Sequence, residues 1–134
     1  MRKQSVEIQV RFSDLDAYGH VNNAMYLSYL EIARVKLVNE LFIKDMARNI
    51  QYLLITAHVK YIQPVLLEDV LIVDCWFSEV GKVKFRAEYE LHNGTGKVYA
   101  TGYTEHALFD GNTKRPIRIT DELREFATSS QEQA

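Results

Sequence analysis

The sequence predicts an α+β domain in which an antiparallel sheet packs against one long helix. Five stretches have the patterns of strands, and most of them alternate apolar and polar residues with a period of two. One stretch instead spaces its apolar residues by three and four, as a half-buried helix does. Short polar turns separate the later strands, and strands joined by hairpins run antiparallel. A single helix is available to cover one face of this sheet.

The first strand is expected over residues 6–12, where apolar and polar residues alternate. A polar segment rich in Asp, Asn and Gly follows over residues 13–22. Asn22 is expected to be the N-cap of the long helix, because its side chain can accept from the first unpaired backbone N–H groups. The helix is expected next because one stripe carries Leu27, Leu30, Arg34, Leu37, Val38 and Leu41.

The remaining elements follow after about residue 49. Strands are expected over residues 55–61, 70–77, 83–91 and 97–109. The run 70–77 is nearly continuous in apolar residues, which suggests a strand covered on both faces. A short helix is expected over residues 120–127, with Thr120 as its cap.

Composition limits the class of protein. With 134 residues, 47% hydrophobic and 25% charged, the chain is expected to form one domain over residues 1–134. A formal net charge of −2 argues against a dedicated nucleic-acid-binding protein, which usually shows a basic stripe. No signal sequence and no apolar run near the ~18–20 residues of a membrane span is visible, so a cytoplasmic location is expected.

Cysteine and histidine usage excludes some kinds of site. The one cysteine, Cys75, cannot form a disulfide within the chain. The four histidines are widely spread and lack the spacing of common metal-binding motifs. We therefore expect no metal.

The segment over residues 13–26 carries the most chemistry. It ends at the start of the long helix, where unpaired backbone N–H groups and the helix dipole favour negative charge. Two carboxylates, Asp14 and Asp16, and the imidazole of His20 stand just before that point. Attack on a carbonyl needs a group that activates water or attacks directly, and a group that binds the oxyanion. The segment supplies both.

Residues 11–34 read RFSDLDAYGHVNNAMYLSYLEIAR. This run resembles the signature of hotdog-fold acyl-CoA thioesterases of the 4-hydroxybenzoyl-CoA thioesterase type. It is also similar to the matching segment of plant acyl-ACP thioesterases, which share the DLD and HVNN elements. The resemblance implies a hotdog fold, in which a five- to six-stranded antiparallel sheet wraps around one long helix, with the site at a dimer interface.

The resemblance also implies site roles for two positions. The catalytic carboxylate of the family falls on Asp16, and the helix N-terminal N–H that polarises the thioester carbonyl falls on Asn23. Some members have a proline where this chain has Ala17, and apolar or aromatic residues in place of HVNN. An aromatic substrate is therefore no better supported than an aliphatic one.

Further substrate contacts are expected from His20, Tyr26, Thr56, His58 and Lys82. His20 could instead order the loop, and Thr56 and His58 could face solvent or an interface. Lys82 follows the turn at Gly81, in the region where relatives bind the nucleotide. Asp14 is expected to hold the loop by hydrogen bonds rather than to act on substrate.

The expected activity is hydrolysis of an acyl-CoA or acyl-ACP thioester, with Asp16 as base or nucleophile. Coenzyme A would enter as part of the substrate, and no separate cofactor is expected. One alternative is a hydratase or dehydratase of the same fold, although such enzymes use a histidine at a spacing that differs from that of His20. The other alternative is an acyl-CoA-binding protein without turnover. Because long exposed sheet edges invite pairing, a homodimer is expected. The resemblance further implies that dimers assemble to a tetramer, since tetramers are common among similar proteins.

Overall fold

The computed structural model describes residues 1–129 of the chain. In chain order its elements are β1 (Lys3–Ile8), the 3₁₀ turn η1 (Phe12–Asp14), α1 (Met25–Ala47), β2 (Ile50–Tyr61), β3 (Leu71–Val80), β4 (Lys84–His92), β5 (Val98–Asp110), β6 (Arg115–Ile117) and α2 (Asp121–Thr128). The short C-terminal helix is capped as predicted, because Thr120 Oγ1 accepts from the backbone N–H of Leu123 at 3.1 Å.

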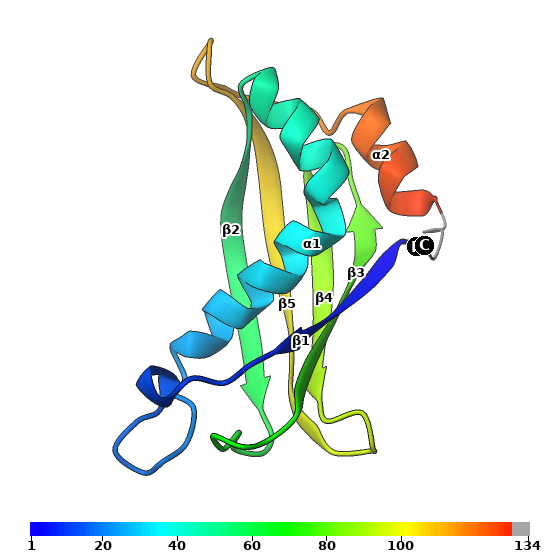
Figure 1. Ribbon diagram of the computed structural model, residues 1–134. Coiled ribbons are helices and arrows are strands. Elements are labelled where there is room, and N and C mark those ends of the chain that lie inside the picture. Colours follow the sequence, from blue (N-terminus) through cyan, green and yellow to red (C-terminus); the bar gives the residue numbers. More distant parts are fainter. Residues whose placement is uncertain (130–134) are drawn as a thin grey trace.

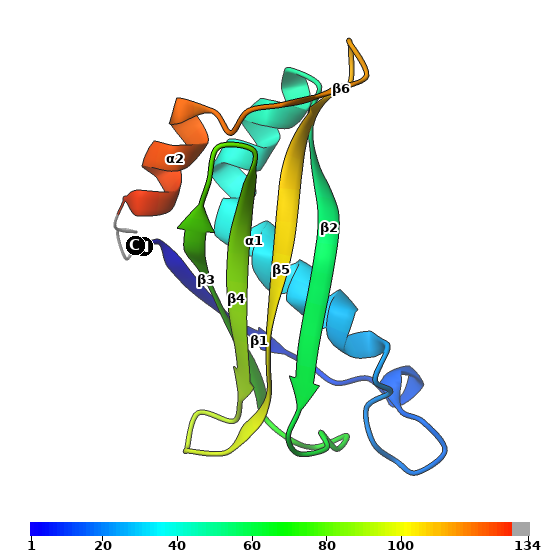
Figure 2. The same cartoon turned by 180° about the vertical axis from the view of Figure 1, so that it is seen from behind.

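The strands form one six-stranded antiparallel sheet with the order β1-β3-β4-β5-β2. The short β6 pairs with residues 108–110 of β5. The long helix α1 crosses one face of the sheet, and it changes direction about halfway along its length (Figures 1 and 2). The expected α+β architecture of the hotdog type is confirmed.

The core lies between α1 and the face of the sheet that it covers. From the helix it takes Tyr26, Tyr29, Leu30, Ala33, Leu37, Val38 and Leu41. From the strands it takes alternate residues, among them Phe77, Phe85, Tyr89 and Leu108. No helix of the described residues is long and apolar enough to cross a membrane.

β3 differs from the prediction of a strand covered on both faces. Its burial alternates strictly from Leu71 to Ser78, with fully buried residues facing α1 and partly exposed ones between them. The outer residues include the apolar Ile72 and Trp76. Among residues 1–129, helices cover only one face of the sheet, so an apolar run did not mean burial on both sides.

β2 is an edge strand, and it starts earlier than predicted. It begins at Ile50, and its pairing with β5 shifts register between Leu54 and Thr56. Ile55 is therefore the extra residue of a β-bulge. Leu54 and Ile55 are 51% and 55% exposed, so this edge presents apolar side chains to solvent.

Candidate active site at the start of the long helix

The loop between η1 and α1 is folded back on itself by backbone hydrogen bonds. The N–H of Asp16 donates to the carbonyl of His20 at 2.7 Å, and that of Val21 donates to Val65 at 2.8 Å. The turn between them needs Gly19, whose φ of +78° is in the region that side chains disfavour. The loop is thus held close to the segment that follows β2.

The carboxylate of Asp16 is anchored through one oxygen. Its Oδ1 accepts from the backbone N–H groups of Tyr18 at 2.9 Å and of His20 at 3.2 Å. Its Oδ2 has no hydrogen-bond partner among residues 1–129. The side chain is partly buried. Oδ1 therefore fixes the orientation of the carboxylate, and Oδ2 is available to react.

The start of α1 leaves a backbone donor unpaired. The helix begins at Met25, so the prediction that Asn22 is its N-cap is wrong. Asn22 Oδ1 instead accepts from the N–H of Ala24 at 2.9 Å, because the chain makes a tight turn before the helix. The N–H of Asn23 makes no hydrogen bond with the described part of the chain. It is a donor at the positive end of the helix dipole.

A pocket of about 380 Å³ joins these groups. Its wall is made of Asp16, Tyr18, His20, Val21, Asn23, Tyr26, Tyr61, Ile62, Gln63 and Pro64. Four of the residues predicted from the sequence, Asp16, His20, Asn23 and Tyr26, thus lie around one cavity. The unpaired carboxylate oxygen and the unpaired N–H belong to residues that share this wall.

Sequence reasoning missed Tyr61. Its ring meets that of Tyr26 edge-on, with centroids 4.8 Å apart, and its hydroxyl donates to the carbonyl of Asn23 at 3.0 Å. It therefore joins the end of β2 to the start of α1. The only signal in the sequence is its place as the last residue of the alternating series Ile55, Ala57, Val59 and Tyr61, shortly before Gln63-Pro64.

Three predicted substrate contacts lie outside this pocket within one chain. Thr56 and His58 pair with Glu105 and Tyr103, which are on the sheet face away from α1. The ring of His58 stacks on Tyr103 with centroids 5.2 Å apart. Lys82 lies in the turn between β3 and β4, at the end of the sheet opposite to the loop of residues 13–24 (Figure 2).

Asp14 holds the loop to the helix. It is 1% exposed, and it accepts from the Tyr29 hydroxyl at 2.7 Å and from the Arg11 guanidinium at 3.0 Å. Burial by itself raises the pKa of Asp14, but the hydrogen bonds from Tyr29 and Arg11 outweigh burial and hold this pKa below its ordinary value. Its role is structural, as the sequence predicted.

A cluster on the outer sheet face contains the residue types of a metal site. Potential ligand atoms of Asp74, Glu90 and His92 all lie within 4.8 Å of one another. However, His92 Nδ1 accepts from the N–H of Gly94 at 3.0 Å, so a neutral ring carries its proton on Nε2. That nitrogen faces Asp74 Oδ2 at 3.0 Å. Hydrogen bonding within the cluster therefore uses the nitrogen that a metal would need.

Comparison with known proteins places this geometry in context. Residues 10–127 match the model of the Thioesterase-like superfamily. The long-chain acyl-CoA thioesterase FadM of Escherichia coli is 30% identical over 122 residues, which are 89% of this chain and 92% of that protein. The crystal structure of YbaW, a probable thioesterase from Escherichia coli, superposes with a TM-score of 0.84 at 28% identity, over 91% of this chain and 94% of that one. A Thermus thermophilus thioesterase solved with coenzyme A and Zn gives a TM-score of 0.81 at 30% identity, over 92% and 90% of the two chains.

Proposed function

This chain belongs to the Thioesterase-like superfamily and is a thioester hydrolase, and from that premise we propose that it hydrolyses acyl-CoA to the free acid and coenzyme A. One observation carries the proposal. The pocket at the start of α1 is shared by a carboxylate with an unpaired oxygen, on Asp16, and by the residue with an unpaired helix N-terminal N–H, Asn23. The similarity to a long-chain acyl-CoA thioesterase supports coenzyme A as the carrier and a fatty acyl group as the acid.

In the proposed reaction the thioester carbonyl oxygen accepts from the N–H of Asn23. Negative charge that develops on this oxygen is stabilised by the donor and by the helix dipole. Asp16 Oδ2 either takes a proton from a water that attacks the carbonyl carbon, or attacks that carbon itself to give an anhydride that water then opens. In both routes the carbon–sulfur bond breaks, and the departing thiolate gains a proton. His20 and Tyr26 are proposed to contact the bound thioester from the pocket wall.

A thiol-release screen tests this function. The purified protein is given a panel of straight-chain and aromatic acyl-CoA thioesters, together with the matching acyl-ACP, before and after dialysis against a chelator. We expect release of free thiol from acyl-CoA at a rate that the chelator does not change. Loss of enoyl-CoA absorbance without free thiol would favour a hydratase of the same fold. Tight acyl-CoA binding without thiol release would favour a binding protein.

The second copy expected from the sequence is also part of the proposal. β2 is a twelve-residue edge strand, and its outer edge exposes Leu53, Leu54 and Ile55. Antiparallel pairing of two β2 strands would satisfy the edge and cover these side chains. We propose a homodimer built in this way, with two dimers associating to a tetramer. The cytoplasmic location expected from the sequence stays a prediction.

Sedimentation equilibrium checks the assembly. The wild-type protein should sediment as a multiple of the 15.5 kDa chain, and Ile55→Lys should shift it toward the monomer because a charge at the edge opposes strand pairing. The matched control is Val83→Lys, since Val83 is also exposed, at 59%, but lies in the turn between β3 and β4. A monomeric wild type, or equal effects of the two variants, would contradict the proposed interface.

A further inference from the structure

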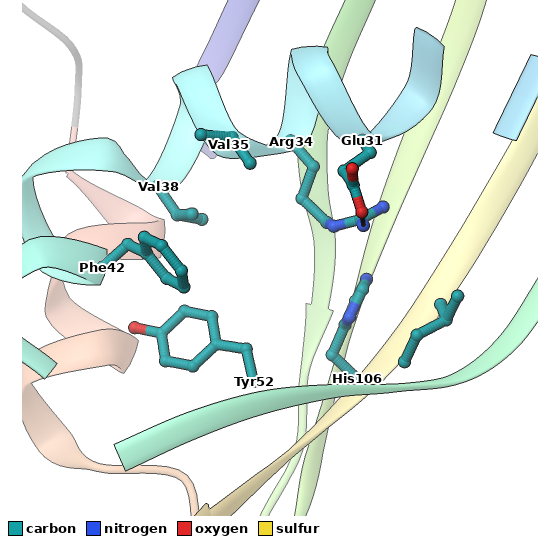
Figure 3. A pocket seen from close by; sticks show the side chains of 8 residues that line it. Glu31, Arg34, Val35, Val38, Phe42, Tyr52 and His106 are labelled. Carbon is teal, nitrogen blue, oxygen red and sulfur yellow. Dashed lines mark ion pairs between the residues drawn. The ribbon is translucent and has the colours of Figure 1, made fainter. Parts of the chain in front are cut away.

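A second cavity lies between the bent helix α1 and β2, and it is separate from the pocket around Asp16. It has a volume of about 370 Å³ (Figure 3). Val35, Val38, Phe42 and Leu54 make most of its wall apolar, and Arg34 and His106 bring polar groups into it. We call this cavity the helix groove.

The helix groove continues toward the start of α1. A neighbouring hollow of about 150 Å³ shares Arg34 and Leu54 with it and reaches Leu27. Leu27 directly follows Tyr26, which lines the Asp16 pocket. The three cavities are therefore lined by successive parts of the same helix, and the last two share residues. Arg34 comes eleven residues after Asn23, which is about 16 Å along a helix at 1.5 Å per residue.

Arg34 brings unused hydrogen-bond donors into this apolar surrounding. Its side chain is only 16% exposed, and its guanidinium makes one hydrogen bond, to the Tyr89 hydroxyl at 3.2 Å. The nearest carboxylate, that of Glu31, is 3.8 Å away on a side chain that is 69% exposed. A guanidinium has five N–H donors. Most of them have no partner within residues 1–129.

A chain of hydrogen bonds connects Arg34 to His106. Tyr89 and Thr104 share a bond of 2.5 Å, and Thr104 Oγ1 lies 2.9 Å from His106 Nε2. Arg34 can only donate, so the Tyr89 oxygen accepts from it. In one of the two directions open to the Tyr89–Thr104 bond, Tyr89 donates to Thr104, and Thr104 then donates to His106 Nε2.

With the bonds in that direction, His106 is a neutral donor toward the groove. Burial, together with the positive charge of Arg34, lowers the pKa of His106 to about 3. A neutral ring that accepts at Nε2 carries its proton on Nδ1. That Nδ1–H has no partner in the part of the chain that the structure describes, although the residue is 1% exposed. Figure 3 shows the ring directed toward Arg34 and Glu31.

We propose that the helix groove receives the acyl chain, and that Arg34 and His106 together bind an oxygen acceptor, an oxo or carboxylate group, carried far from the thioester. This inference rests on the proposed thioesterase function and names its substrate class. When a plain hydrocarbon chain fills the groove, the Arg34 and His106 donors lose water and gain no acceptor, which is unfavourable. An acyl chain with an acceptor at this depth satisfies both of them, whereas a plain chain of equal length does not.

The test compares chains that differ only in that acceptor. Dodecanoyl-CoA is measured beside the mono-CoA thioester of dodecanedioic acid and beside 11-oxododecanoyl-CoA. The readout is the ratio of kcat/KM for each oxygenated chain to kcat/KM for the plain chain. We expect a ratio of about ten or more in the wild type, since hydrogen bonds to a charged donor are worth about 1.5–3 kcal/mol. In Arg34→Met the ratio should fall about tenfold, and Arg34→Lys, which keeps a cationic donor, should restore part of it.

The matched control is Lys36→Met, because Lys36 is a cation two residues along the same helix whose ammonium donates to the Ser5 carbonyl at 3.4 Å and does not line the groove. It should leave the ratio unchanged. A wild-type ratio near one, or the same ratio in Arg34→Met, would overturn the proposal.

Binding separates this inference from the proposed function. If the wild type hydrolyses none of the three thioesters, the proposed function fails. The same three chains as thioether analogues of acyl-CoA cannot be hydrolysed, and their dissociation constants then test the subsite alone. Tighter binding of the oxygenated analogues, lost in Arg34→Met, supports the subsite. Equal binding of all three analogues refutes it.

Discussion

Asp16→Asn is expected to lower kcat for acyl-CoA hydrolysis by about 10²–10⁴-fold, the usual contribution of a positioned base. The amide oxygen of asparagine can still accept from the N–H groups of Tyr18 and His20, so the loop should keep its shape. What the variant removes is the basic and nucleophilic carboxylate. The change is measured by thiol release at saturating substrate, with circular dichroism to confirm the fold.

The matched control is Asp69→Asn. Asp69 also uses its carboxylate to accept a backbone N–H, that of Leu66 at 2.9 Å, but it does not line the Asp16 pocket. It should leave kcat within about twofold of the wild type, a change of under 0.5 kcal/mol. Asn23→Ala should also be milder than Asp16→Asn, because alanine keeps the backbone N–H. Wild-type turnover by a folded Asp16→Asn protein would remove Asp16 from the proposed reaction.

Asp14→Ala is expected to lower the free energy of unfolding by roughly 3 kcal/mol. The variant leaves the buried Tyr29 hydroxyl without its acceptor, and it leaves Arg11 without its carboxylate partner. The loss should far exceed that in Tyr29→Phe, because there Asp14 keeps its hydrogen bonds from Arg11. Urea denaturation of the three proteins at neutral pH measures the difference. Equal stability of Asp14→Ala and wild type would show that Asp14 does not hold the loop.

The contribution of Asp14 to the free energy of unfolding should decrease at acidic pH. The pKa of Asp14 is lowered in the folded protein from an ordinary value of 3.8. A lowered pKa means that the folded state favours the ionised form, so the charge-dependent part of this stabilisation is complete above 3.8 and is lost as pH falls through the lowered pKa. The difference in free energy of unfolding between the wild type and Asp14→Asn should therefore become smaller below pH 3.8. A gap that stays constant down to pH 2 would contradict this assignment.

Local sequence patterns predicted much of the fold. The period of two in β4 and β5, the helical stripe of α1 and the cap at Thr120 all depend on neighbours within a few residues. The bulge at Ile55 was not visible, because it arises from the pairing of β2 with β5. The half-covered outer face of β3 was not visible either, since an apolar run does not state how many layers will cover it.

In the candidate site, too, the sequence predicted some features and the fold decided others. Alternation in β2 separated Thr56 and His58 from Ala57 and Val59, but it did not say which set would face the helix. Hairpin geometry then placed Lys82 at the far end of the sheet. The sequence by itself determined that Asp16, His20 and Asn23 would lie together, because eight residues of one turn-rich loop connect them to the helix.

Only the tertiary structure brought Tyr61 against Tyr26, and joined Arg34 through Tyr89 and Thr104 to His106. Those contacts cross between the helix and strands that are far apart in the chain. Spacing along a sequence determines what one element presents on each face. Which elements meet is decided by how the whole sheet closes around the helix.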